Sequence, residues 1–124
     1  MPDDRLSLLD RLVDHYFRRR PVNATFTGMH TLDHRLPDWS AAGVSQLLDE
    51  MRADRDGIAA VASASMDDCV EQRDWVGMDL ALADSFLEIQ VAELEGRHFQ
   101  RGNPSLIIGE ATFAIISLMI RDAE

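Results

Sequence analysis

The apolar run from Leu106 to Ile120 constrains this chain more than any other feature of its sequence. Asn103 and Pro104 make a good cap and first position for a helix, and on a helical wheel the large side chains of the run leave no polar face. Four such side chains left in water would forgo about 6 to 12 kcal/mol of burial, which is comparable with the stability of a whole domain. We therefore expect this helix to be covered by more protein.

The partner that covers this helix is expected to be the rest of a larger domain or a second copy of the chain. A membrane is excluded as the partner, because Glu110 interrupts the run and a membrane span needs roughly 20 apolar residues. A symmetric dimer would cover the helix by pairing it with its copy. The side chains expected at this interface are Ile107, Ile108, Phe113, Ile116, Met119 and Ile120.

Charge and cysteine content narrow the function classes. The formal net charge is −10, from 22 acidic residues against 12 arginines, and this excludes nucleic acid as a partner, because its binding needs a basic face. Thirteen of the acids lie between Leu47 and Glu95, and we interpret them as solvated helix faces rather than an acidic docking surface. The single cysteine, Cys69, excludes an internal disulfide. An amino terminus without an apolar segment predicts a cytoplasmic location.

Apolar spacings of three and four residues predict helices at about 4–20, 40–64, 75–101 and 104–120. Residues 21–40 break this period and predict one long ordered loop. The chain is therefore expected to be all-α, with about four helices in a bundle-like arrangement and residues 1–124 forming a single helical region. The uncovered final helix indicates an amino-terminal fragment of a larger α-helical domain.

The apolar spacing also predicts which side chains face the core. In the first helix they are Leu6, Leu9, Val13, Tyr16 and Phe17, and in the third helix they are Trp75, Met78, Leu82, Phe86 and Ile89. The side chains expected to anchor the loop to the core are Phe26, Met29, Leu32, Leu36 and Trp39.

The loop holds the most suggestive cluster of polar side chains, His30, Asp33, His34 and Asp38. In a helical turn, the two histidines would share a face with Asp33, and these are ligand types suited to a divalent metal. Pro37 argues against a regular turn. Three interpretations stay open: a metal site, a substrate cleft within a larger protein, and caps and hydrogen bonds that satisfy the loop backbone.

Two stretches resemble the amino-terminal region of the bacterial family called domain of unknown function 885. They are the loop PVNATFTGMHTLDHRLPDWS and the segment FLEIQVAELEGRHFQRGNPSLIIGEATFAIISLMIRD, from residue 86 to 122. The resemblance implies a larger, mostly helical protein similar to zinc-dependent peptidases, with an HExxGHH-like motif far downstream. That motif is absent from this sequence, so no catalytic or zinc-binding residue carries over. The loop positions implied to face a cleft are Asn23, His30, Asp33, His34, Arg35 and Asp38.

The resemblance and the apolar run together lead to a functional expectation. The chain is expected to be the scaffold or cleft-wall segment of a metal-dependent hydrolase that acts on peptides or related amides, and to be inactive alone. No cofactor is expected in this chain, since zinc is implied only for full-length relatives. The alternative is a stand-alone helical interaction module that forms a homodimer and has no enzymatic role.

Overall fold

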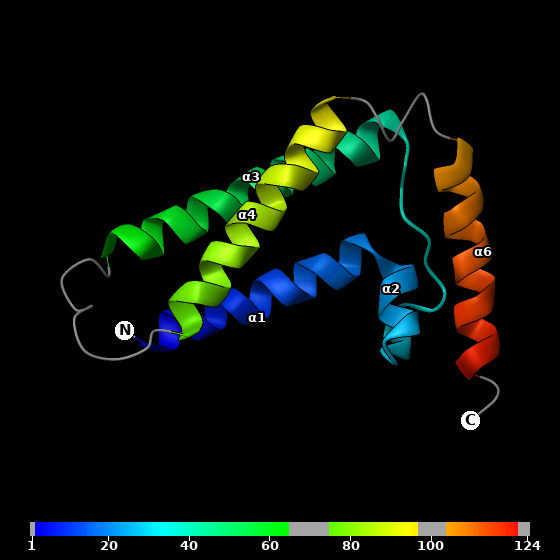
Figure 1. The fold of residues 1–124 in the computed structure, drawn as a ribbon, viewed down its shortest axis with the longest axis horizontal. Coiled ribbons are helices and arrows are strands. Elements are labelled where there is room, and N and C mark those ends of the chain that lie inside the picture. Colours follow the sequence, from blue (N-terminus) through cyan, green and yellow to red (C-terminus); the bar gives the residue numbers. More distant parts are fainter. Residues whose placement is uncertain (1, 65–74, 97–103, 122–124) are drawn as a thin grey trace.

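A computed structural model describes residues 2–64, 75–96 and 104–121 of the chain. Its elements are α1 (Pro2–Arg19), α2 (Pro21–Phe26), the 3-10 helix η1 (His30–Leu32), α3 (Ala41–Ala64), α4 (Trp75–Glu95) and α6 (Pro104–Arg121). The described residues contain no β-strand, so the predicted all-α, bundle-like fold is confirmed (Figure 1). The predicted end of the third helix, at about residue 101, lies outside these residues.

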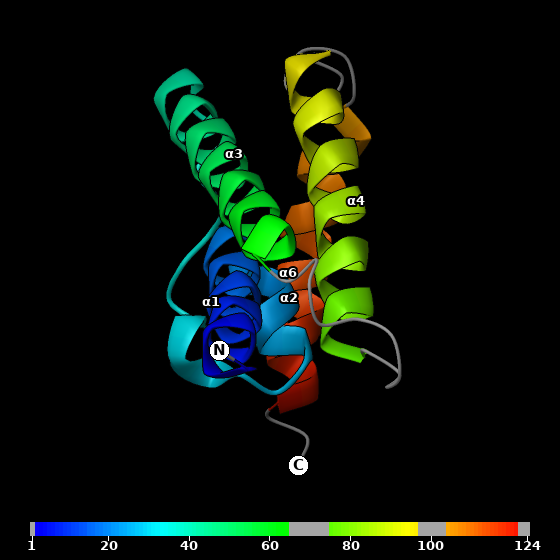
Figure 2. The ribbon, with the colours of Figure 1, turned by 90° about the vertical axis from the view of Figure 1, so that its left-hand side faces the viewer.

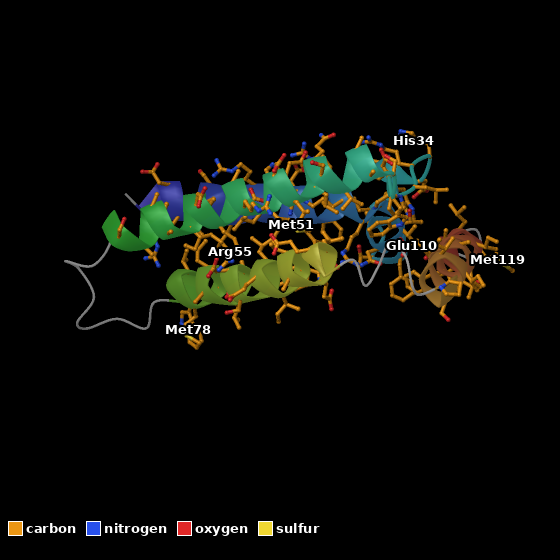
Figure 3. All side chains as sticks on the ribbon, turned by 90° about the horizontal axis from the view of Figure 1, so that it is seen from above. His34, Met51, Arg55, Met78, Glu110 and Met119 are labelled. Carbon is orange, nitrogen blue, oxygen red and sulfur yellow. The ribbon has the colours of Figure 1, made fainter. Side chains whose placement is uncertain are left out.

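The body of the molecule consists of α1, α3 and α4, which pack on one another and enclose the hydrophobic core (Figures 1 and 2). Figure 3 shows Met51 of α3 between the helices, where its side chain is 3% exposed. The core side chains are Leu8 and Leu12 from α1, Val44, Met51 and Ile58 from α3, and Leu80, Leu87, Val91 and Leu94 from α4.

The face of α4 that the spacing predicts as core-facing lies outside the core. Leu82 is 66% exposed, and Figure 3 shows Met78 pointing away from the other helices. Leu80 and Leu87 lie on the other side of the helix and are buried instead. Because α4 carries large apolar side chains on both sides, its periodicity does not distinguish the side that the body covers. The predicted core face of α4 was therefore wrong.

The predicted face of the first helix is correct in part, since Leu9 packs against the core cluster. Leu8 and Leu12 are buried, whereas Leu6 and Val13 of the predicted face are about half exposed. The predicted apolar faces of α1 and α4 instead meet at the surface, where Tyr16 and Phe86 make an edge-to-face ring contact with centroids 5.9 Å apart.

The segment predicted as one long loop contains its own helix. Pro21 ends α1 because it lacks a backbone N–H, and the same proline opens α2, where its fixed φ suits the first helical position. Val22 and Ala24 anchor the segment by burial, while the predicted anchors Phe26, Met29 and Leu36 are exposed. Trp39 does pack against the core cluster, as predicted.

The last helix, α6, lies at one end of the molecule and packs mainly on the short helix α2 (Figures 1 and 2). Phe26 and Phe113 stack with ring centroids 4.8 Å apart, and Ser117 of α6 is 2% exposed. None of the helices within the described parts of the chain is both long and apolar enough to cross a membrane.

Candidate functional site

A polar cavity of about 310 Å³ lies between the end of α1, the segment before α3 and the first half of α3. Arg35 and Asp38, two of the predicted cleft residues, lie in its wall together with His15 and Glu50. Its other lining residues are Arg18, Arg19, Leu36, Pro37, Trp39, Gly43, Gln46 and Leu47. The lining is rich in charged side chains, so the cavity is suited to binding a polar group.

Behind this cavity, Asp54 of α3 connects α3 to α1. The Nδ1 atom of His15 lies 2.8 Å from Asp54 Oδ1 and 3.0 Å from Oδ2, and Arg19 donates to the same carboxylate. The side chains of Asp54 and Arg19 are only 5% and 7% exposed. A buried carboxylate held by two donors is satisfied, and it fixes the orientation of the imidazole at the cavity wall.

Sequence reasoning missed this network. The contact joins residues 39 positions apart in the chain, so no local spacing could reveal it. The one available signal was Asp54, an acid that falls on the apolar side of its helix between Met51 and Ile58.

Asp38 holds the start of α3 in place. Its carboxylate accepts the backbone N–H of Ser40 at 2.9 Å, and this bond keeps the pKa of Asp38 below its ordinary range. The Ser40 hydroxyl in turn accepts the N–H of Gly43 at 3.0 Å, which caps the start of α3. A Cβ at position 43 would lie 2.4 Å from Asp38 Cγ, so glycine is needed for this close approach.

The other predicted cleft residues lie elsewhere and mainly support the local fold. Asn23 donates to the Tyr16 hydroxyl at 2.9 Å. Asp33 accepts the hydroxyl of Thr25 at 2.7 Å and lies 3.2 Å from His30 Nδ1. His34 is exposed at the edge of the molecule (Figure 3).

The predicted cluster is thus divided between a loop-stabilising pair and the cavity. Within residues 2–64, 75–96 and 104–121, no group of three or more histidine, cysteine, aspartate or glutamate side chains is arranged to hold a metal ion.

The exposed apolar side chains of α6 form a second candidate site, which we call the α6 face. Of the six predicted interface residues, Phe113 is used inside the chain against Phe26. The other five are exposed, and Ile115 joins them. The exposed fractions are 62% for Ile107, 65% for Ile108, 61% for Ile115, 44% for Ile116, 68% for Met119 and 49% for Ile120.

A third candidate site is the outer side of α4, which we call the α4 stripe. Its members and exposed fractions are Trp75 at 60%, Met78 at 55%, Leu82 at 66%, Phe86 at 42% and Ile89 at 58%. An apolar groove of about 630 Å³ runs beside the stripe, between Leu82 and Phe86 of α4 and Val13 and Phe17 of α1. Contiguous apolar surface of this extent is typical of an interaction site.

Three acids of α4 are turned toward α3 and away from this stripe. Arg55 of α3 donates to Asp84 at 2.7 Å and lies 3.4 Å from Glu88, and the bond to Asp84 raises the pKa of the Arg55 guanidinium. Arg52 donates to Glu95 at 2.6 Å, which raises its pKa likewise. Three of the five acids of α4 therefore face α3, whereas Asp79 lines the groove beside the stripe.

Comparison of the chain with known protein families, with curated proteins and with solved structures finds no match.

Proposed function

We propose that this chain is a helical scaffold that packs against further helices and has no catalytic centre of its own. The observation that carries the proposal is the α6 face, where six large apolar side chains are between 44% and 68% exposed. Leaving such side chains in water forgoes roughly 1.5 kcal/mol or more for each one, so a helix of this composition gains stability when other protein covers it.

The family resemblance gives this scaffold a context, a larger metal-dependent hydrolase. In that setting α6 becomes an interior helix, and the polar cavity beside Arg35 and Asp38 forms part of a cleft wall. Metal and catalytic groups would come from the remainder of the larger protein, as an HExxH-type motif implies. The role of Arg35 and Asp38 would be to orient a polar substrate group at the cleft edge.

Reconstitution tests this proposal. The chain is produced together with the polypeptide that carries the HExxH-type motif, and light scattering and zinc-dependent peptide cleavage are measured. We expect a 1:1 complex that cleaves the peptide. Ile116→Asp should abolish both complex formation and cleavage, whereas the conservative Ile116→Val should preserve both. A complex that forms equally well with Ile116→Asp would contradict the role of the α6 face.

Zinc titration by calorimetry tests the absence of a catalytic centre separately. The isolated chain is expected to release no stoichiometric binding heat. Tight binding of one zinc ion would show that its histidines form a metal site and would overturn this part of the proposal.

A second candidate function is a non-enzymatic module that forms a homodimer. The observation that favours it is the α4 stripe, which lies on the opposite side of its helix from the core and needs a partner of its own.

A further inference from the structure

We propose that the α4 stripe is a self-association surface, on which α4 of a second copy packs antiparallel about a two-fold axis through Leu82. This inference rests on the proposed role of the exposed apolar faces as interfaces, and it assigns one of them a definite partner. The α6 face remains available for a different partner in the same assembly.

The order of residues along the stripe carries the inference. Met78 and Phe86 stand four positions before and after Leu82, and Trp75 and Ile89 stand seven positions before and after it. A two-fold axis makes residue i meet residue j while j meets i. An antiparallel pair centred on Leu82 therefore sets Leu82 against Leu82, Met78 against Phe86 and Trp75 against Ile89. Every apolar member of the stripe meets another apolar member.

Charge is compatible with this pairing despite the net charge of −10 on each copy. Asp79 lines the groove on the α1 side of the stripe, so in the pair it would lie beside Phe86 of the second copy, and the two Asp79 residues would be about 9 Å apart along the helix axis. Asp84 and Glu88 are turned toward Arg55 of their own chain. The pairing thus brings no carboxylates together at its centre, where like charges would be most costly.

The area available matches what a stable dimer needs. The stripe continues onto α1 through Leu6 and Val13, which are 51% and 53% exposed and lie seven positions apart on one side of that helix. At about 100 Å² for each half-exposed large side chain, the combined surface is on the order of 700 Å² per copy. A standard interface buries about 800 Å² per partner. The dimer would bring two copies of α1 and of α4 into a four-helix arrangement.

Analytical ultracentrifugation of the full chain tests the partner. Wild type is expected to sediment as a dimer, and Leu82→Asp, which places two carboxylates together at the axis, should raise the dimer dissociation constant on the order of 100-fold. Ala81→Asp is the matched control, because Ala81 is exposed on the α3 side of the same helix, beside Arg55. It should leave the constant within about threefold. Equal circular dichroism and melting curves establish that both variants fold.

Cysteine crosslinking tests the register in a Cys69→Ser background. Leu82→Cys should form a disulfide-linked dimer. Met78→Cys and Phe86→Cys should crosslink poorly alone, since their symmetric partners would lie about 12 Å apart along the axis, and should crosslink when the two variants are mixed.

Two outcomes would overturn the proposal. One is a wild-type monomer at concentrations up to about 100 μM, where an interface of this size associates. The other is a dimer that does not crosslink through position 82 and is lost with Ile116→Asp, which would assign self-association to the α6 face. If the Ile116→Asp variant still crosslinks through position 82, the α4 pairing is supported. This result does not depend on the reconstitution experiment, so the two proposals can fail separately.

Discussion

The body formed by α1, α3 and α4 encloses nine apolar side chains in one cluster, whereas α6 rests on the six-residue helix α2 and leaves most of its large side chains exposed. The helices α4 and α6 are both rich in large apolar side chains but have different neighbours. In the body, α4 is covered on one side by both α1 and α3 and keeps a second apolar side outward. Burial thus depends on how many elements surround a helix and not on its composition alone. A helix with a single short neighbour is expected to open more readily than the body.

The largest expected effect is at Asp54, which tests whether the stability of the body depends on the contact between α1 and α3. Asp54→Ala removes the carboxylate that His15 and Arg19 share and leaves a buried guanidinium without its main partner. We expect the free energy of unfolding to fall by about 3 to 5 kcal/mol, measured by urea denaturation. Asp54→Asn, which keeps the shape and one acceptor oxygen, should lose less. A loss below about 1 kcal/mol for Asp54→Ala would show that α1 and α3 do not depend on this network.

The two sides of α4 are compared directly by the same substitution at two leucines. Leu87→Ala opens a cavity in the core and should lower the free energy of unfolding by about 2 to 4 kcal/mol. Leu82→Ala, measured at a concentration where the chain is monomeric, should change it by less than about 0.5 kcal/mol, because Leu82 is 66% exposed. Equal effects at the two positions would mean that the stripe is covered within a single chain.

An aromatic contact contributes to the attachment of α6 to α2. Phe113→Ala removes the ring that stacks on Phe26, and we expect the local opening free energy of α6 to fall by about 1 to 2 kcal/mol. Amide hydrogen exchange should become faster across residues 104–121 and remain unchanged in the body. Faster exchange in α3 would show that α6 and the body unfold as one unit.

The smallest expected effect concerns Asp38 and pH. Its folded-state pKa is lowered by the hydrogen bond from Ser40, so the stability that it contributes is present above its unfolded-state pKa and is lost as pH falls through the folded value. Asp38→Asn should remove this part of the acid dependence while leaving the profile above about pH 5 parallel to wild type. Unfolding curves collected from neutral to acid pH measure the difference. Identical acid dependence in both proteins would contradict the assignment.

Local signals in the sequence predicted the helices well. Pro104 opens α6 as expected, and the end of α1 and the start of α3 lie within one residue of the predicted positions 20 and 40. The same signals failed in the segment at 21–40, where a helix of six residues is too short to show a period. They also placed the predicted cleft residues together, although His30 and Asp33 pair in one place while Arg35 and Asp38 line the cavity in another.

The sequence by itself determined where the long helices begin, that the chain is all-α, and that α6 carries more apolar surface than it can hide. Those properties are local, because backbone hydrogen bonds, caps and prolines act within a few residues. Only the tertiary structure decided which side of α4 is buried and that His15 meets Asp54. The physical reason is that a helix with two apolar sides has two nearly equivalent ways to pack, and the choice between them depends on neighbours that are distant in the sequence. The unused side, the α4 stripe, is where we expect the second copy to bind.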